Sequence, residues 1–262
     1  MSLRLGAVAV ATALFACALA APDADAATVK LYGRVASGDV AIAGSAVTIY
    51  AASAGSPRVL ARTTSNSVGN FGARYEEVGA SEVVYAVADG GSVRGHRPNA
   101  AIRLLTVIAG PPRFAQINEL TTVAGAGALA QFLDGKKVSG PKPGLPNAAA
   151  TFFNLASPEG TPGDVIGLPP NGDETEAQAT LDSLADLLSG CVRDAKTCDA
   201  LFKAAKPAGG AKPKNTLAAA HAIALDPGGN PAELFGLLPS TKPYTPVLAS
   251  APAASTIALK YT

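Results

Sequence analysis

The stretch NELTTVAGAGALAQFL, residues 118–133, is the longest segment of this 262-residue chain that is typical of a buried helix. Its apolar residues cover more than one helical face: Leu120, Val123, Ala124, Ala128, Leu129, Phe132 and Leu133. A helix that is apolar nearly all round is normally buried. Asn118 is a favourable N-cap because its side-chain oxygen can accept from the free amides of the first turn. We therefore expect this helix, ended by Asp134-Gly135, to lie at the centre of the fold.

Two glycines interrupt this helix, among the outward positions Thr121, Gly125, Gly127 and Gln131. Each glycine costs roughly 1 kcal/mol relative to alanine in a helix interior. This cost indicates that another backbone approaches the helix closely there. A membrane span is the alternative, but it needs about 20 apolar residues. The run is shorter, so no transmembrane helix is expected in the mature chain.

The chain before this helix has the two-residue alternation of β-strands. In the first strand, Val29 and Leu31 face one way, and Lys30 and Tyr32 face the other. Turn residues separate six such segments, at residues 28–35, 43–50, 59–64, 70–75, 82–88 and 101–109. Short strands at this spacing predict an antiparallel β-sandwich over residues 27–110.

The chain after residue 110 has the pattern of short helices separated by loops rich in glycine and proline. Helix starts are expected at Asn147, at Thr197, at Asn215, at Asn230-Pro231 and at a capping box formed by Asp173 and Glu176. Residues 111–238 are thus predicted to form a small helical domain, joined to the sandwich by residues 111–116. The predicted fold class is α+β.

Residues 239–262 form a tail rich in proline, alanine and serine. Its last residues, 256–262, alternate once more, with Ile257, Leu259 and Tyr261 on one side. We predict a strand there, docked on the free edge of the chain's own sandwich. The alternative is pairing with a partner or with a further domain.

The first 26 residues have the features of a signal peptide. Arg4 supplies the positive charge, residues 5–19 are apolar, and Ala24-Asp25-Ala26 fits the cleavage site. The sequence before Cys17 also resembles a lipoprotein cleavage box, so a lipid anchor on Cys17 is the alternative. Either route predicts a secreted, periplasmic or cell-surface protein.

Two cysteines remain in the mature chain, Cys191 and Cys198. An even number in an exported protein favours a disulfide. On a continuous helix a separation of seven residues spans about 10 Å, whereas bridged Cα atoms lie within about 7 Å. We therefore predict a disulfide across a helix break.

Composition excludes several classes of function. Lys and Arg number 21 against 20 for Asp and Glu, which gives no footprint for nucleic acid. Nucleotide-binding loops, nucleophile elbows and zinc-protease motifs are absent from the sequence. No catalytic residue, metal site or cofactor is therefore predicted.

Two parts of the sequence resemble known families. The pattern around residues 43–50, AGSAVTIY, followed by Thr64, Gly69 and Phe71, resembles the carboxypeptidase-regulatory or transthyretin-like β-sandwich, related to Cna-B modules. Residues 117–133 and the later cysteine-containing helices resemble the region that precedes NHL-type β-propellers in secreted bacterial proteins. The resemblance implies a spacer or binding module, without the propeller itself.

Few residues are candidates for a binding site. Arg94, His96 and Arg97 form a basic loop that could contact an anion or simply be solvated. Glu119 begins the central helix, where the helix dipole favours a carboxylate; it could pair with Arg103 or Arg113, or hold a ligand. The other histidine, His221, is expected to be half-buried and hydrogen-bonded.

The sequence favours an exported, non-enzymatic binding or scaffolding module of a bacterial cell envelope that contacts protein or glycan. Two alternatives remain: a carbohydrate-binding module and a hydrolase with an unrecognised site. A glycan binder should expose an aromatic platform, which in the predicted sandwich could come from Tyr32, Tyr50, Tyr75 or Tyr85.

Overall fold

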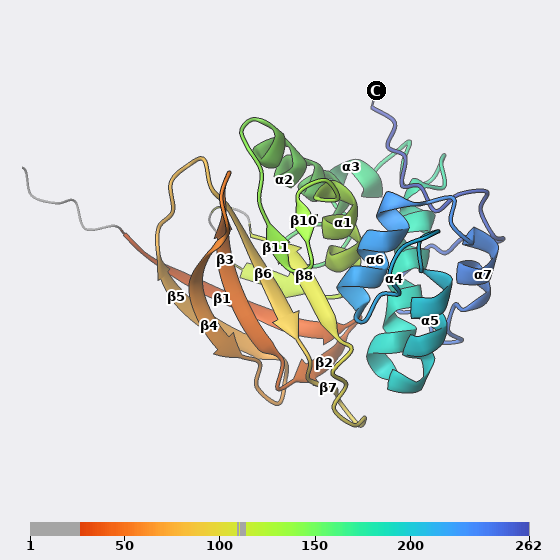
Figure 1. Ribbon diagram of the computed structural model, residues 1–262, viewed down its shortest axis with the longest axis horizontal. Coiled ribbons are helices and arrows are strands. Elements are labelled where there is room, and N and C mark those ends of the chain that lie inside the picture. The colour runs from red at the N-terminus through yellow and green to blue at the C-terminus, as the bar shows by residue number, and fades with distance from the viewer. Residues whose placement is uncertain (1–26, 109, 111–113, 262) are drawn as a thin grey trace, which may run out of the picture.

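The computed structural model describes residues 27–108, 110 and 114–261. Strands fill one half of the molecule and helices the other, as Figure 1 shows. The predicted signal peptide, including Cys17, lies outside the described residues.

The strands belong mainly to the first half of the chain, and all six predicted segments are strands. In order they are β1 (Thr28–Ser37), β2 (Val40–Ala43), β3 (Ala46–Ala52), β4 (Arg58–Thr64), β5 (Asn70–Glu76), β6 (Val83–Asp89), β7 (Ser92–Val93), β8 (Arg103–Val107), β9 (Phe114–Ile117), β10 (Leu133–Asp134) and β11 (Lys137–Val138).

The helices follow the strands, apart from the small β10–β11 pair. They are α1 (Glu119–Ala128), α2 (Gly144–Leu155), α3 (Asp164–Gly167), α4 (Ala177–Arg193), the 3-10 turn Ala195–Thr197, α5 (Cys198–Ala204), α6 (Thr216–Leu225) and α7 (Pro231–Gly236). Among the described residues, no helix is long and apolar enough to cross a membrane.

The strands form two larger sheets and one small hairpin. One sheet has the order β5-β1-β2-β7, with β9 also paired to β1; the other has the order β4-β3-β6-β8 and is antiparallel throughout. The pairing of β9 with β1 is parallel, so the first sheet is mixed rather than purely antiparallel. Within the predicted linker at residues 111–116, residues 111–113 lie outside the described residues, and the rest belongs to a strand: β9 returns to the first sheet and buries Ala115 and Ile117.

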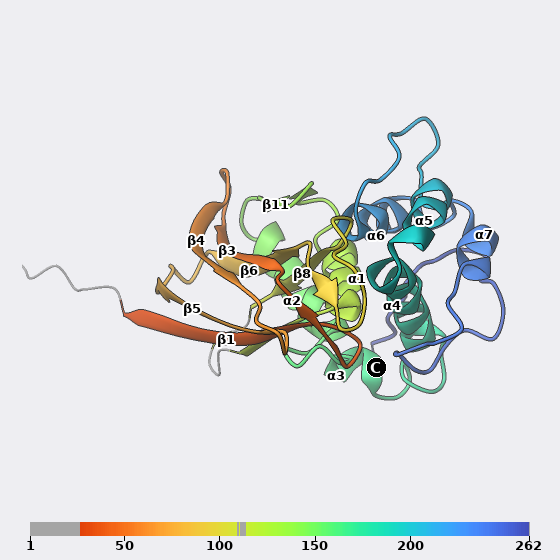
Figure 2. The same ribbon diagram turned by 90° about the horizontal axis from the view of Figure 1, so that it is seen from below.

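The second sheet is the middle layer of the molecule. On one face its Ile49, Ala86 and Leu104 meet Leu31 and Phe71 of the first sheet. On the other face, other side chains of β3, β6 and β8 pack against the helices. Figures 1 and 2 show the helices gathered at one side of the strands. Burial on both faces explains why β6 is a continuous apolar run rather than an alternating one.

Helix α1 lies between the second sheet and the other helices, as predicted. The Asn118 side chain accepts from the Thr121 amide at 2.9 Å, and the Thr121 hydroxyl accepts from the Asn118 amide in return. The helix ends at Ala128, earlier than predicted, and Thr121 and Gly125 are buried rather than outward. At Gly125 the close neighbour is the Leu105 side chain, not a second backbone.

The other predicted helix starts have mixed outcomes. Asn215 caps α6 through the Ala218 amide at 2.9 Å. Asn147 lies inside α2, which begins earlier, at Gly144, and buries Leu145 in the core. Three expected caps form no side-chain capping bond: the Asp173–Glu176 box before α4, Thr197 before α5 and Asn230 before α7.

The predicted disulfide between Cys191 and Cys198 is present, with Cα atoms 4.5 Å apart. The helix break that it needs is made by the end of α4 at Arg193 and the 3-10 turn that follows. The Asn99 side chain donates to the Cys191 carbonyl at 2.7 Å, which ties this loop to the sheet half.

The predicted C-terminal strand is wrong. Residues 256–261 belong to no strand, and they lie against the helices rather than on a sheet edge. Ile257 and Leu259 pack on the helical core cluster. The Asn171 side chain replaces a neighbouring strand: its amide nitrogen donates to the Lys260 carbonyl at 2.9 Å, and its oxygen accepts from the Lys260 amide at 2.8 Å.

Candidate functional site

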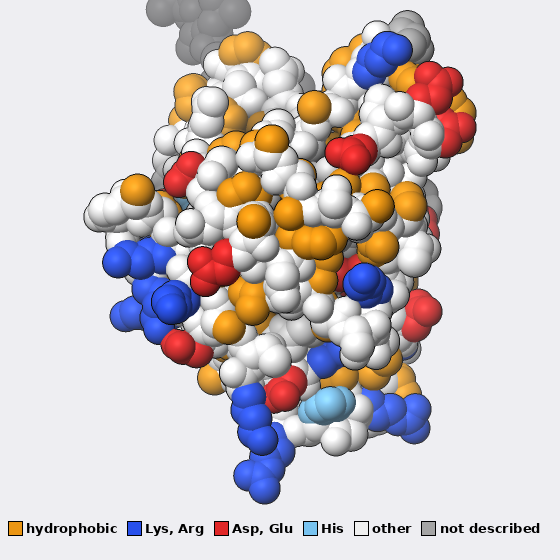
Figure 3. Space-filling model, turned by 90° about the vertical axis from the view of Figure 1, so that its right-hand side faces the viewer, with side chains coloured by type: hydrophobic (Ala, Val, Ile, Leu, Met, Phe, Trp, Pro, Cys, Tyr) orange, Lys and Arg blue, Asp and Glu red, His pale blue; other side chains and the backbone are white. Residues whose placement is uncertain are grey.

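The helical half contains an apolar cavity of about 360 Å³. Helices α1, α2, α4 and α6 form its walls, and the C-terminal tail forms one side. Its apolar lining residues are Val123, Ala128, Leu155, Leu184, Leu188, Ala220, Ile223, Ala224, Pro227, Ile257 and Leu259. Hydrophobic side chains also gather at the centre of the face over the helical half (Figure 3).

The tail side of this cavity is held by a few polar contacts. The Ser255 amide donates to the Pro227 carbonyl at 2.7 Å. The Tyr261 hydroxyl accepts from the Asn154 side chain at 3.2 Å. These contacts and the Asn171 clamp fix the tail at points along its length.

Glu119, a predicted site residue, lies outside this cavity and is completely buried. Its Oε2 accepts from the Tyr244 hydroxyl at 2.6 Å and from the Gly38 amide at 3.2 Å. Its Oε1 has no hydrogen-bond partner among the described residues. Burial raises the pKa of Glu119, and the nearby Ser37 and Tyr244 hydroxyls act in the opposite direction.

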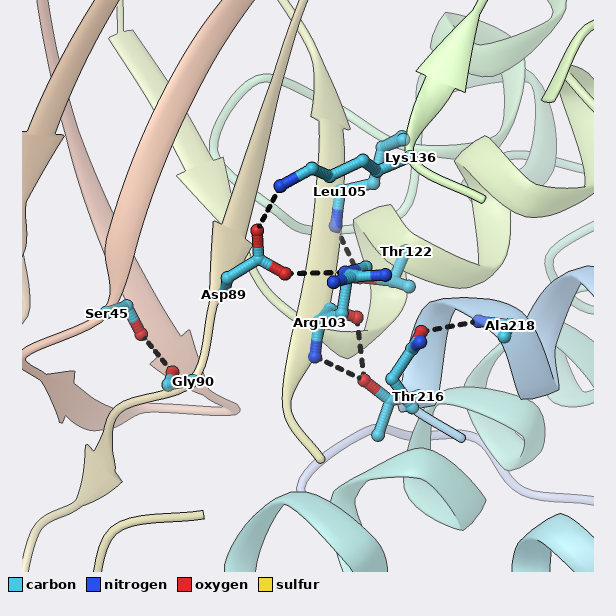
Figure 4. A network of polar contacts seen from close by, with 10 residues as sticks. Ser45, Asp89, Gly90, Arg103, Leu105, Thr122, Lys136, Thr216 and Ala218 are labelled. Carbon is cyan, nitrogen blue, oxygen red and sulfur yellow. Dashed lines mark hydrogen bonds and ion pairs between the residues drawn. The ribbon is translucent and has the colours of Figure 1, made fainter. Parts of the chain in front are cut away.

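The expected pairing of Glu119 with Arg103 is wrong, and Arg113 lies outside the described residues. Arg103 instead pairs with Asp89 at 2.5 Å, and Lys136 reaches the other oxygen of Asp89 at 3.1 Å (Figure 4). The backbone of Arg103 bonds the Thr216 hydroxyl. This network joins the second sheet to α6 and the β10–β11 hairpin, which is a structural role.

Two further carboxyls on α4 are buried near the tail. Asp186 accepts from the Tyr244 amide at 3.0 Å, and Asp182 accepts from the Gln178 side chain at 3.3 Å. Each retains one oxygen without a partner among the described residues. Burial raises the pKa of Asp182 to about 7 and that of Asp186 to about 6. Asp186 thus holds the tail, and neither acid lines the helical cavity.

The basic loop is exposed at Arg94, His96 and Arg97 and is not brought near Glu119 by any described contact. The backbone of His96 forms hydrogen bonds within the turn. Its amide donates to the Val93 carbonyl, and its carbonyl accepts from the Ser92 hydroxyl. His221 is partly buried and bonded to the Ala130 carbonyl at 2.8 Å, as predicted.

Among the described residues, no group of three or more histidines, cysteines and acids is placed to hold a metal ion. Sequence reasoning missed the cavity and the buried acids Asp182 and Asp186. In the sequence these two acids are four residues apart on a predicted helix, with leucines beside them. The same spacing is equally typical of a solvent-exposed helix face, so it could not identify them as buried.

Comparison with known proteins adds no family. No protein-family model matches the chain, and no curated protein matches it. Among solved structures, a 9R-lipoxygenase from Cyanothece PCC8801 aligns with a TM-score of 0.21 and 12% identity. The alignment covers 77% of this chain and 25% of the lipoxygenase. A likeness of this size carries no argument about fold or activity.

Proposed function

We propose that this protein is an exported, non-enzymatic binding module of the bacterial cell envelope that holds a small apolar ligand in the helical cavity. The two-sheet part is proposed to be a transthyretin-like sandwich. The Cys191–Cys198 disulfide supports an extracytoplasmic location, because such bonds persist in oxidising compartments.

The cavity is the observation that carries this proposal. Ligand pockets of proteins have volumes of about 300–1,000 Å³ and mostly apolar walls, and this cavity, at about 360 Å³, lies at the small end of that range. A mostly apolar lining favours an apolar ligand, because binding then removes apolar surface from water. A short hydrocarbon chain or a single ring system fits this chemistry.

The polar groups near the cavity support binding rather than turnover. Its polar lining consists of hydroxyl side chains, such as Thr151, Ser255 and Tyr261, without an acid, a histidine or a lysine. His221, on the neighbouring α6, is occupied by the Ala130 carbonyl. Hydroxyls can orient a ligand by a hydrogen bond, but they need a base to act as nucleophiles.

Gly127 provides the test. It lines the cavity, and a Cβ added there would meet nothing within 4 Å, so a larger residue can be introduced without a clash at its Cβ. The leucine side chain would then take up space at the cavity wall. We expect the mature protein to enhance the fluorescence of N-phenyl-1-naphthylamine and Gly127→Leu to lose this enhancement. Gly236→Leu, also in open space but outside the cavity, should bind as wild type does. Equal binding by wild type and Gly127→Leu, or no binding by wild type, would contradict the proposal.

A further inference from the structure

A second surface lies at the opposite end of the molecule, on the outer face of the first sheet. Strands β5, β1 and β9 lie side by side there, and their alternate residues point away from the core. The outward residues used below are Lys30, Tyr32, Arg34, Gly72, Arg74 and Phe114. The helices lie on the far side of the second sheet and leave this face open (Figure 1).

An aromatic row crosses this face. Tyr32 is opposite Phe114 on one side and Gly72 on the other, in register. The Tyr32 side chain is 62% exposed and Phe114 is 38% exposed, whereas Tyr50, Tyr75 and Tyr85 are buried. Of the four tyrosines that could form a platform, Tyr32 alone does so, and Phe114 extends it.

Gly72 leaves a hollow beside the Tyr32 ring. A Cβ added at Gly72 would have its nearest neighbours, the Leu31 carbonyl and the Tyr32 ring, at 4.0 Å. The resulting depression has a volume of about 250 Å³ and is lined by Lys30, Leu31, Tyr32, Gly72, Ala73 and Arg74. Glycine within a strand often marks a site where a ligand approaches the backbone closely.

Positive charge borders this hollow. Lys30 lies directly opposite Arg74, and like charges in that position destabilise a sheet. Neither forms an ion pair with another described residue, and Arg34, one row further, donates to the Asp39 carbonyl rather than to an acid. Glu76, two residues along β5 on the same face, forms no ion pair with either cation among the described residues, so an anion placed between Lys30 and Arg74 would reduce their repulsion.

We propose that this face binds an acidic polysaccharide. A sugar ring stacks on Tyr32 over Gly72, and its carboxylate lies between Lys30 and Arg74. The positive charge that would attract the polysaccharide is confined to this face, because in the whole chain 21 Lys and Arg residues are balanced by 20 acids. A compact site of this kind fits one charged sugar unit rather than the regular phosphate track of a nucleic acid, which needs a longer basic stripe.

The test uses the mature protein and a short oligogalacturonate, followed by calorimetry. We expect binding that weakens as salt rises, because exposed charges are screened within about 10 Å at 0.1 M. The methyl-esterified, neutral oligosaccharide should bind up to about fivefold more weakly, which corresponds to the upper range for an exposed ion pair.

Variants on this exposed face separate the contribution of ring stacking from that of charge, and they leave the core unchanged. Tyr32→Ala and Gly72→Leu should each weaken binding at least about tenfold, whereas Tyr32→Phe, which keeps the ring, should bind as wild type. Arg74→Gln should lose most of the preference for the charged ligand. Arg62→Gln removes an exposed arginine on β4 of the other sheet and is the control.

Three outcomes would overturn the proposal. They are equal affinity for the charged and the neutral oligosaccharide, unchanged affinity of Tyr32→Ala, and tighter binding of a single-stranded oligonucleotide than of the oligogalacturonate. Because Gly127→Leu alters only the helical cavity, it should bind the oligosaccharide normally. Failure here and failure of the apolar-ligand proposal are therefore distinguishable.

Discussion

The Tyr244 hydroxyl lies 2.6 Å from Oε2 of Glu119, although 125 residues separate them in the chain. The Gly38 amide donates to both groups, at 3.1 Å to the Tyr244 hydroxyl and at 3.2 Å to Glu119. One buried cluster thus joins the turn between β1 and β2, the start of α1 and the C-terminal tail. It connects the sheet half to the helical half at the point where the central helix begins.

Replacing Tyr244 by phenylalanine should destabilise the protein by about 1–3 kcal/mol, because a buried carboxyl oxygen loses a hydrogen-bond donor. Urea unfolding measures this change. Tyr261→Phe is the matched control, since it removes an exposed hydroxyl bonded to Asn154, and surface changes stay within about 0.5 kcal/mol. Equal stability of the two variants would show that the buried bond contributes nothing.

The buried acids predict that stability falls as the pH rises. Burial raises the pKa of Asp186 to about 6 and that of Asp182 to about 7, from an ordinary value of 3.8. Between pH 4 and 7 the unfolded chain has therefore lost protons that the folded protein retains. Each group then lowers the free energy of unfolding by up to about 1.4 kcal/mol per pH unit within its window.

Urea unfolding at pH 4.5, 5.5, 6.5 and 7.5 checks this prediction. The free energy of unfolding should decrease across the series for wild type and decrease less for Asp182→Asn, which cannot ionise. Asp173→Asn, whose acid lies outside the buried cluster, should follow the wild-type slope. A stability that rises with pH over this range, or identical slopes for the two variants, would contradict the assignment.

Local patterns in the sequence predicted the local structure. The alternation of apolar and polar residues around Val29 and Leu31 correctly predicted the first strand, and the capping side chain of Asn118 correctly predicted the start of the central helix. The disulfide followed from cysteine count and from the distance that a helix imposes on residues 191 and 198. In each case the deciding interaction lies within a few residues, so the sequence contains it.

Contacts between distant segments could not be predicted in this way. Ile257 and Leu259 alternate as a strand does, yet they pack on the helical core cluster, and the backbone of the neighbouring Lys260 bonds the Asn171 side chain instead of a sheet edge. Glu119 was assigned to an arginine, but its partners come from the tail and from Gly38. The periodicity of apolar residues predicts which side chains are buried, but it does not predict which surface of the protein they pack against.

The two glycines of α1 should respond to alanine with opposite signs. A Cβ at Gly125 would overlap the buried Leu105 side chain, much closer than van der Waals contact allows, so Gly125→Ala should cost about 1–3 kcal/mol by overpacking. A Cβ at Gly127 meets open space, so Gly127→Ala should gain up to about 1 kcal/mol of helix propensity. Thermal unfolding compares them, and Leu105→Ala should reduce the cost of Gly125→Ala in a double-mutant cycle.

Removing the disulfide should lower stability by about 2–3 kcal/mol, the chain-entropy value for so short a loop. The variant is Cys191→Ala with Cys198→Ala, and urea unfolding with and without dithiothreitol measures the change. Dithiothreitol should destabilise wild type and leave the double variant unchanged. If the reductant has no effect on wild type while mass spectrometry shows free thiols, the bond does not stabilise the fold.

The last prediction concerns the clamp that closes the cavity. The Asn171 side chain bonds both backbone groups of Lys260 and also the Val165 carbonyl. Asn171→Ala should therefore free the tail, so that the Lys260 amide exchanges with solvent faster by hydrogen-exchange mass spectrometry, because local opening then needs fewer broken bonds. Asn154→Ala, which loses only an exposed bond to Tyr261, should change this exchange little.

If the apolar probe enters the cavity through the tail side, its association rate should rise in Asn171→Ala and not in Asn154→Ala. A Lys260 amide that already exchanges freely in wild type would show that the clamp does not hold the tail in solution.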